Sequence, residues 1–166
     1  MEEFLIQIRA SSKQGLYLVS FLTALTMPSI CGSLSSADGA DIPVNYADWY
    51  DTYMLPRYAN FFPGAACYKF RCSMLHQGST QTRPELFSRV LFIEPTQNQP
   101  ITMHLNKFDD ALNIDVKIFC EDICKAVEKW LAQTPNDVNY AKHKHQLITR
   151  HPEGLPPYVQ GIPVIS

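Results

Sequence analysis

The residues best suited to chemistry lie together in the segment FRCSMLHQG, residues 70–78, where Arg71 and His76 are separated by four residues. A guanidinium can hold a phosphate through paired hydrogen bonds and can stabilise charge that develops on it. An imidazole, with an ordinary pKa of about 6.5, can accept or donate a proton near neutral pH. This pair of residue types is therefore compatible with acid–base chemistry on an anionic group.

The element that must position the pair is a helix predicted over residues 65–77 and ended by Gly78. Residues five apart on a helix are rotated by about 140° and offset by about 7.5 Å, so Arg71 and His76 do not point the same way. The long Arg71 side chain could still reach a shared cleft. Cys72 and Ser73 precede His76 by four and three residues, so either could touch its ring.

The same two residues also have a purely structural interpretation. Arg71 could pair with Asp48 or Asp51, and His76 could stabilise the helix C-terminus, where the helix dipole favours a cation. Chance matters too, because six arginines and five histidines in 166 residues give this spacing roughly one time in five. The spacing alone leaves both interpretations open.

Other reactive residue types form no recognisable site. The five cysteines are an odd number, which is typical of reduced thiols in a cytoplasmic protein. Cys120 and Cys124 would share a helix face, but the sequence supplies no second ligand pair at zinc-site spacing. The sequence also has no phosphate-binding glycine loop and no H-E-x-x-H motif. We therefore expect neither a metal nor a cofactor.

Hydrophobic periodicity predicts a mainly α fold, a bundle of about four to five helices. A small β-hairpin is expected near residues 89–105, with strands at 89–94 and 101–105 joined by PTQNQP. Asp109 and Asp110 suit a turn or a helix start. The predicted helices cover residues 2–10, 16–31, 45–55, 65–77 and about 114–133.

The sequence predicts one domain over residues 1–134 and an irregular, proline-rich tail over 135–166. The tail ends in PPYVQGIPVIS, which is too apolar for a freely solvated linker, so we expect it to pack on the domain or on a partner. The net charge of −2 argues against a protein that coats nucleic acid by charge alone. Residues 14–37 carry no charge, and we interpret their apolar part as a buried core helix rather than a membrane span.

The Arg71 and His76 pair, set in this helical pattern, resembles the HEPN superfamily, helical domains marked by an arginine, four to six residues and a histidine. The resemblance covers about residues 2–133. It implies a homodimer that joins two copies of the motif, and in many members a metal-independent ribonuclease of toxin or antiviral defence systems. Other members are not catalytic. Cys72 stands where the family often has Asn, Asp or His.

Three hypotheses follow. The first is a cytoplasmic, homodimeric ribonuclease that cleaves RNA through Arg71 and His76, supported by Cys72 and Ser73, with an antitoxin or another protein as a further partner. The second is a non-catalytic HEPN-like module for nucleotide or RNA binding or for dimerisation. The third, ranked last, is a membrane-associated protein anchored through residues 16–30.

Overall fold

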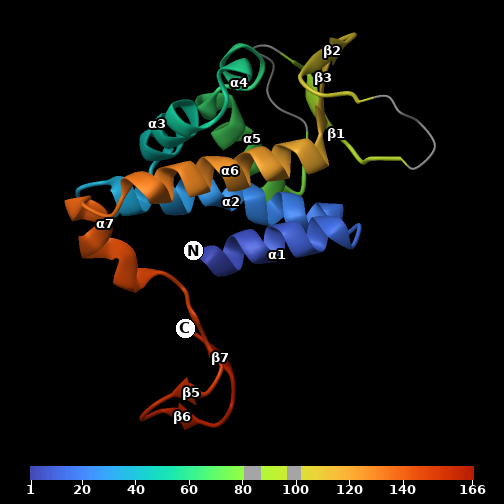
Figure 1. Ribbon diagram of the computed structural model, residues 1–166. Helices are drawn as coiled ribbons and strands as arrows, with labels where there is room; N and C mark the ends of the chain where they lie inside the picture. The colour runs from blue at the N-terminus through green and yellow to red at the C-terminus, as the bar shows by residue number, and fades with distance from the viewer. Residues whose placement is uncertain (81–86, 97–101) are drawn as a thin grey trace.

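The computed structural model describes residues 1–80, 87–96 and 102–166. Helices account for most of the described residues, so the predicted mainly α class is confirmed (Figure 1). The helices are α1 (Glu2–Lys13), α2 (Tyr17–Ser35), α3 (Pro43–Tyr53), α4 (Pro56–Phe61), α5 (Gly64–Gln77), α6 (Val116–Gln133) and α7 (Val138–His143). The longer strands are β1 (Arg89–Ile93), β2 (Asn106–Phe108) and β3 (Ala111–Asp115).

Helix α2 is the element around which the others are arranged. It contacts α1, α3, α5, α6 and α7, and Figure 1 shows α6 running across it with α1 alongside. By length and composition α2 is apolar enough to cross a membrane, and 56% of its most apolar window is buried by the other elements. The uncharged run is thus the central helix of the fold.

Helix α2 is longer than the sequence predicts. The sequence favours an end before Gly32, but the helix continues to Ser35. Gly32 instead allows the backbones of α2 and α3 to lie close together, because a Cβ at position 32 would lie 2.5 Å from the backbone oxygen of Asn45. Position 32 therefore sets how tightly α3 packs on α2.

The predicted β-hairpin is wrong. Strand β1 does form, but it pairs in parallel with β3, in the register Arg89 to Ala111. The hairpin joins β2 to β3 through the turn at Asp109 and Asp110. Residues 97–101 of the expected hairpin lie outside the described residues, and 102–105 do not form a strand. The apolar residues of 111–115 are continuous in the sequence with those of the last helix, so the pattern does not mark a separate strand. In the structure they form β3, the central strand of the sheet.

Helix α6 begins directly after β3, and the Asp115 carboxylate caps it by accepting from the backbone N–H of Ile118 at 2.9 Å. Its outer face is tied to α1, because the Arg9 guanidinium donates to Glu121 and to Glu128. These side chains are partly exposed, so the pairs orient the helices more than they stabilise them.

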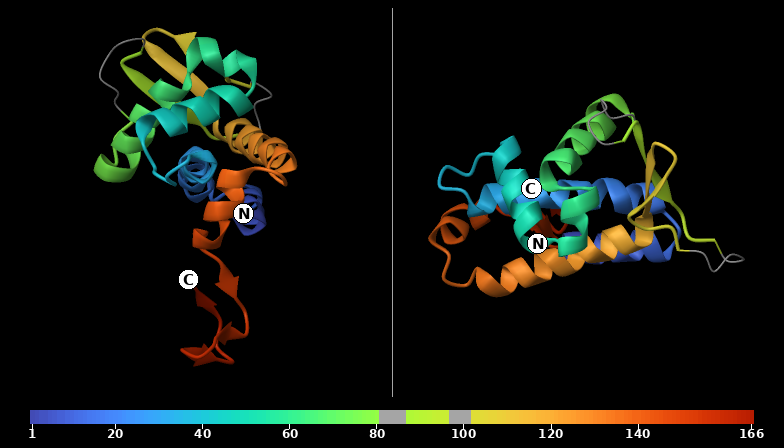
Figure 2. Two further views of the ribbon diagram at one scale, coloured as in Figure 1. Left: turned by 90° about the vertical axis from the view of Figure 1, so that its left-hand side faces the viewer. Right: turned by 90° about the horizontal axis from the view of Figure 1, so that it is seen from above.

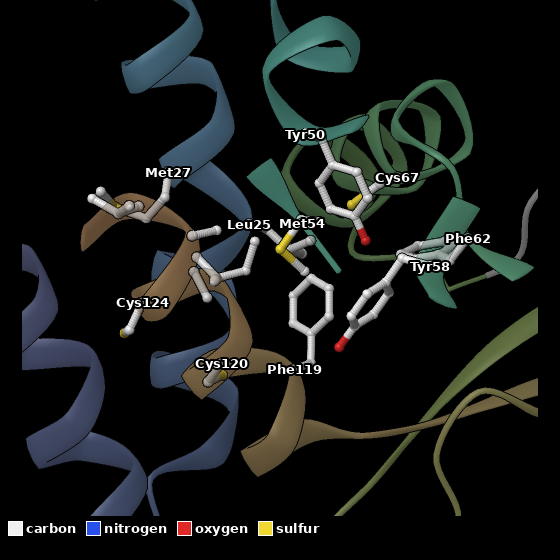
Figure 3. Packing of buried hydrophobic residues seen from close by; sticks show 14 of the residues in the cluster. Leu25, Met27, Tyr50, Met54, Tyr58, Phe62, Cys67, Phe119, Cys120 and Cys124 are labelled. Atoms are coloured by element: carbon white, nitrogen blue, oxygen red, sulfur yellow. The ribbon is translucent and has the colours of Figure 1, made fainter. Parts of the chain in front are cut away.

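Aromatic rings fill the space between α2, α3, α5 and α6 (Figure 3). Phe119 of α6 packs edge-on against Tyr58 at 6.0 Å and against Phe21 at 5.8 Å. Edge-to-face packing suits aromatic quadrupoles and buries a large area with each ring. Tyr46, Trp49 and Tyr50 of α3 are all buried and belong to this core.

The C-terminal region is not irregular throughout. Helix α7 contacts α2, and the 3-10 turn Lys144–Gln146 follows it. Beyond this turn the chain forms an arm, residues 147–166, which projects away from the helices (Figures 1 and 2). Two short ladders hold the arm together, β4 (Arg150–His151) with β7 (Val164–Ile165) and β5 (Gly154–Leu155) with β6 (Val159–Gln160).

Replacing Gly32 by alanine tests the close approach of α2 and α3. The added methyl group would overlap the Asn45 backbone, so we expect a loss of about 1–3 kcal/mol in the free energy of unfolding. Urea denaturation measures it. Lys125→Ala, at an exposed position of α6, is the control and should change stability by less than about 0.5 kcal/mol. Equal stability of Gly32→Ala and wild type would contradict the packing argument.

Candidate functional site

Helix α5, which carries Arg71 and His76, is fixed at both ends. At its start the Asp51 carboxylate accepts from the backbone N–H of Gly64 at 2.7 Å. At its end Gly78 adopts the left-handed conformation, with φ of +62°, as the sequence predicts. Asp51 is therefore engaged at the helix start and does not pair with Arg71.

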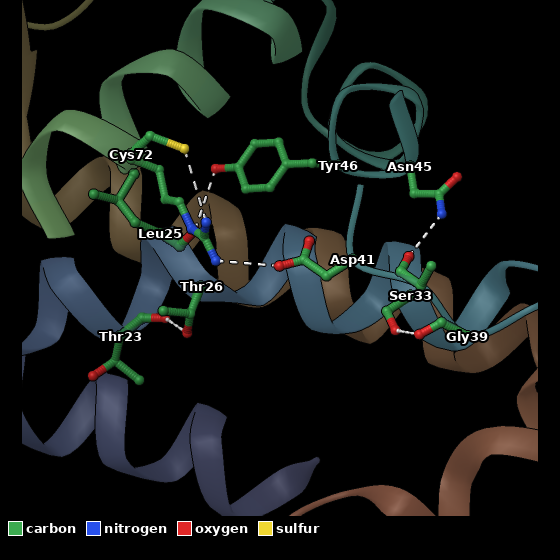
Figure 4. Close-up of polar contacts among 11 residues, drawn as sticks. Thr23, Leu25, Thr26, Ser33, Gly39, Asp41, Asn45, Tyr46 and Cys72 are labelled. Atoms are coloured by element: carbon green, nitrogen blue, oxygen red, sulfur yellow. Dashed lines mark hydrogen bonds and ion pairs between the residues drawn. The ribbon is translucent and has the colours of Figure 1, made fainter. Parts of the chain in front are cut away.

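Arg71 lies in a largely enclosed position, and Figure 4 shows its two side-chain acceptors, Cys72 of α5 and Asp41 of the loop before α3. The Arg71 side chain is 15% exposed, and its guanidinium pairs with the Asp41 carboxylate at 3.4 Å. The guanidinium also donates to the Cys72 sulfur at 3.9 Å and lies 5.9 Å from the Tyr68 ring centre. The acidic partner is thus Asp41, and the expected pairing with Asp48 or Asp51 is wrong.

The contacts of Arg71 leave part of its hydrogen-bonding capacity unused. Its Nε is buried, and none of the described residues accepts a hydrogen bond from it. A buried donor without an acceptor costs about 1–3 kcal/mol, and more when the group is charged. The ion pair to Asp41 is long, and Asp41 itself is 43% exposed. The Nε has no surface open to solvent, so an incoming oxygen would instead meet the guanidinium at its exposed contact with Asp41.

His76 lies in the last turn of α5 and is exposed to solvent. It forms no hydrogen bond or ion pair with a described residue. Among those residues nothing links His76 to Arg71, so one chain does not bring the two side chains together. Because α5 is helical at both residues, Arg71 and His76 start from different sides of the helix, as helix geometry requires.

Neither predicted supporting residue bonds to the His76 ring in the described part of the chain. Cys72 is half-buried, and its sulfur accepts from Arg71 instead. Ser73 is also half-buried, and its backbone carbonyl accepts from the N–H of Ser79 at 3.2 Å, part of the helix ending. Burial, followed by the neighbouring Cys72, raises the pKa of Tyr68. Cys72 therefore belongs to the surroundings of Arg71 and not to those of His76.

An apolar groove of about 390 Å³ adjoins the C-terminal half of α5. Met74 of α5, Leu18 of α2 and Leu91 of β1 contribute to its walls. Leu18 is exposed, and so are Val19, which follows it, and Leu75, which follows Met74. Apolar side chains of both α2 and α5 are thus exposed to solvent.

A second polar cluster, which the sequence did not reveal, joins α4 to α6. Asp122 of α6 is only 7% exposed, and its carboxylate accepts from the Tyr58 hydroxyl at 2.9 Å and from the Arg57 guanidinium. The Tyr58 oxygen also lies 3.2 Å from Nε2 of His104. Since the Tyr58 proton goes to the carboxylate, Nε2 of His104 is the donor and its Nδ1 is unprotonated.

The cluster shifts the titration of its members. Burial lowers the pKa of His104, and the positive charge of Arg57 lowers it further. Its Nδ1 is buried and has no partner among the described residues, so an added proton there would find no acceptor. Burial and the nearby Asp122 charge raise the pKa of Tyr58 above its usual range. The structure therefore holds His104 neutral and Tyr58 protonated.

The sequence contained one signal for this cluster. Asp122 follows Phe119 by three residues and precedes Ala126 by four, so it falls on the apolar stripe of α6. A carboxylate on such a stripe needs a buried partner. The partners could not be identified, because Arg57 and His104 are far away in the sequence and carry no pattern of their own.

Cys120 and Cys124 are both buried on α6, and they form no metal-binding group with the other described residues. Burial raises the pKa of Cys120 to about 11 and that of Cys124 to about 12. Both thiols are therefore protonated at neutral pH. Across residues 1–80, 87–96 and 102–166, no group of three or more His, Cys, Asp or Glu side chains is placed to hold a metal ion.

Tyr58→Phe tests the support of the buried Asp122 carboxylate. The substitution removes a hydrogen bond to a buried charge, so we expect a loss of about 1–3 kcal/mol in the free energy of unfolding, measured in urea. The control is Tyr53→Phe, because the Tyr53 hydroxyl has no hydrogen bond to a described residue, and it should change stability by less than about 0.5 kcal/mol. Similar changes in both variants would mean that Asp122 does not depend on the Tyr58 hydroxyl.

Stability should also depend on pH through His104. The pKa of His104 is lower in the folded protein than in the unfolded chain. Its contribution to the free energy of unfolding is therefore fully present above about pH 6.5 and is lost as the pH falls through the folded pKa. We expect the free energy of unfolding to fall between about pH 7.5 and pH 5.5, and His104→Gln to show a smaller fall. The exposed His76→Gln is the control and should keep the wild-type slope. An unchanged slope in His104→Gln would contradict the assignment.

Comparison of the chain with protein-family models, with curated proteins and with solved structures finds no match.

Proposed function

We propose that this protein is a HEPN-like, metal-independent endoribonuclease that acts as a homodimer, in a toxin or antiviral defence role in the cytoplasm. The observation that carries the proposal is the Arg71 guanidinium, which is largely enclosed and pairs with a single carboxylate, that of Asp41, through a long and partly exposed contact. A phosphate oxygen is, with a carboxylate oxygen, the acceptor that a guanidinium binds best. The exposed His76 on the same helix supplies the proton chemistry.

The proposed reaction is an internal transfer at the RNA backbone. One imidazole takes the proton of a 2′-hydroxyl, and the oxygen attacks the adjacent phosphorus. The bond from phosphorus to the 5′ oxygen breaks, and that oxygen takes a proton from a second His76, which begins the step as an imidazolium and ends it as a neutral imidazole. Arg71 stabilises the charge that develops on the phosphoryl oxygens. The products are a 2′,3′-cyclic phosphate and a 5′-hydroxyl.

The dimer supplies what one chain lacks. A single chain offers one exposed His76 on α5, whereas the proposed reaction uses a base and an acid. Two copies related by a two-fold axis beside α5 would provide both imidazoles and two guanidiniums. Leu18 and Val19 of α2 and Leu75 of α5 are exposed and favour such a contact, because exposed apolar side chains gain by being covered.

A second candidate is a non-catalytic HEPN-like module for RNA or nucleotide binding or for dimerisation. The contact that favours it is the Arg71 to Asp41 ion pair, which occupies part of the guanidinium. Cys72 also stands where the resembled family often carries Asn, Asp or His. This candidate retains phosphate binding by Arg71 and gives His76 no chemical role.

The test is cleavage of single-stranded RNA by the purified full chain. We expect Arg71→Ala and His76→Ala each to reduce the cleavage rate by about 100-fold or more, since each removes a group that acts in the transition state. Arg71→Lys should not restore the rate, because an ammonium cannot make the paired hydrogen bonds. The rate and the product ends are read by gel electrophoresis of labelled RNA.

Matched controls are Arg89→Ala and His145→Ala, which remove exposed groups of the same types elsewhere and should keep the wild-type rate. Circular dichroism and thermal unfolding of every variant exclude loss of fold. Full cleavage by Arg71→Ala or His76→Ala would overturn the proposed site. Wild-type protein that binds RNA and never cuts it at high enzyme excess would favour the non-catalytic module.

A further inference from the structure

The C-terminal arm stands apart from the helices over most of its length. Figures 1 and 2 show residues 147–166 projecting from the helices, on the side where the N-terminus of α1 lies. Each ladder of the arm is only two residues long on each strand. Ribbons of this size gain little stability alone in water, so a further surface is needed to support the arm.

The arm also exposes apolar side chains that a solvated segment would not carry. Tyr158 is 83% exposed, Ile165 69% and Ile162 63%. Single exposed apolar residues are ordinary, but here they recur along one short projecting segment. This pattern is typical of a segment that is covered in the assembled state.

The base of the arm forms a groove with α1, of about 590 Å³. Glu3 and Phe4 line it from the helix, and Ile148, Arg150 and Ile165 line it from the arm. Its apolar walls can take side chains such as those that the arm exposes. The groove and the exposed side chains of the arm are therefore both apolar and suited to pack together.

The charges of the groove indicate which partner fits. Glu3 accepts a hydrogen bond from Gln7, but neither Glu3 nor Arg150 has an ion-pair partner among the described residues. One wall thus offers a negative charge and the other a positive charge. In a two-fold contact between identical chains, each surface meets its own copy, so both charges find opposite partners.

We propose that the arm of one copy docks in the groove between α1 and the arm of a second copy, with Glu3 of each chain paired to Arg150 of the other. Ile165 and Ile148 lie in the covered apolar part of the contact. This interface is separate from the α2 and α5 face invoked for the ribonuclease dimer, and it goes beyond that proposed function. A chain that uses both interfaces forms a closed dimer of dimers when the two two-fold axes cross at right angles.

The test is the molar mass of the full-length protein by size-exclusion chromatography with light scattering. We expect Glu3→Arg and Arg150→Glu each to halve the mass of the wild-type assembly, because like charges then meet at both contacts. An equimolar mixture of the two variants should recover the wild-type mass. In the mixed assembly the introduced arginine of one chain faces the introduced glutamate of the other, and the unchanged Glu3 faces the unchanged Arg150. Only pairing between chains gives this recovery.

Glu2→Arg and Lys144→Glu are the matched controls, since they change exposed charges outside the groove, and both should keep the wild-type mass. Ile165→Asp should halve the mass as the charge variants do. A wild-type monomer, or an unchanged mass in both charge variants, would overturn the proposal. So would a mixture that stays at the reduced mass. RNA cleavage measures the proposed function separately, so its loss or retention does not decide the arm contact.

Discussion

The constraint on which the rest of the structure depends is that α2, with no charged residue along its length, must be covered on most sides. One helix cannot do this, so α1, α3, α5, α6 and α7 all contact it. Polar groups of α2 find partners on the elements that cover it. Ser20 donates to the backbone oxygen of Ile8 at 2.9 Å, and Ser35 accepts from the Trp130 indole at 2.9 Å. The position of α5, and with it that of Arg71, follows from this requirement.

The buried cluster at Asp122 explains how the short helix α4 and the chain before β2 are held. A carboxylate in the core is tolerated only if donors surround it, and Tyr58 and Arg57 supply them from α4. His104 then completes the contact from the other segment. The cluster fixes two connections that have little apolar area of their own. Packing and hydrogen bonding account for its neutral histidine and its buried carboxylate.

The sequence predicts features that depend on neighbouring residues, such as helices and their ends. It does not predict contacts between residues that are far apart in the chain. The helix over residues 65–77 and its end at Gly78 follow from periodicity and from one glycine, and both are confirmed. Strand β3 was mistaken because its apolar residues run directly into those of α6, and only pairing with β1, in the register Arg89 to Ala111, makes it a strand. The Arg71 partner was missed for the same reason, since Asp41 is 30 residues away and lies in a loop without periodicity.

The environment of Arg71 sets a balance between holding the side chain in place and leaving it able to bind. A fully exposed arginine would bind phosphate weakly because water competes for its donors, and a fully paired buried one would not bind at all. Here the ring of Tyr68 and the sulfur of Cys72 restrict the guanidinium without neutralising it. Asp41 neutralises it through one long contact with a partly exposed carboxylate, which a phosphate could displace. The ion pair with Asp41 is therefore compatible with binding, because a phosphodiester offers the guanidinium the same kind of anionic oxygen that the carboxylate gives up.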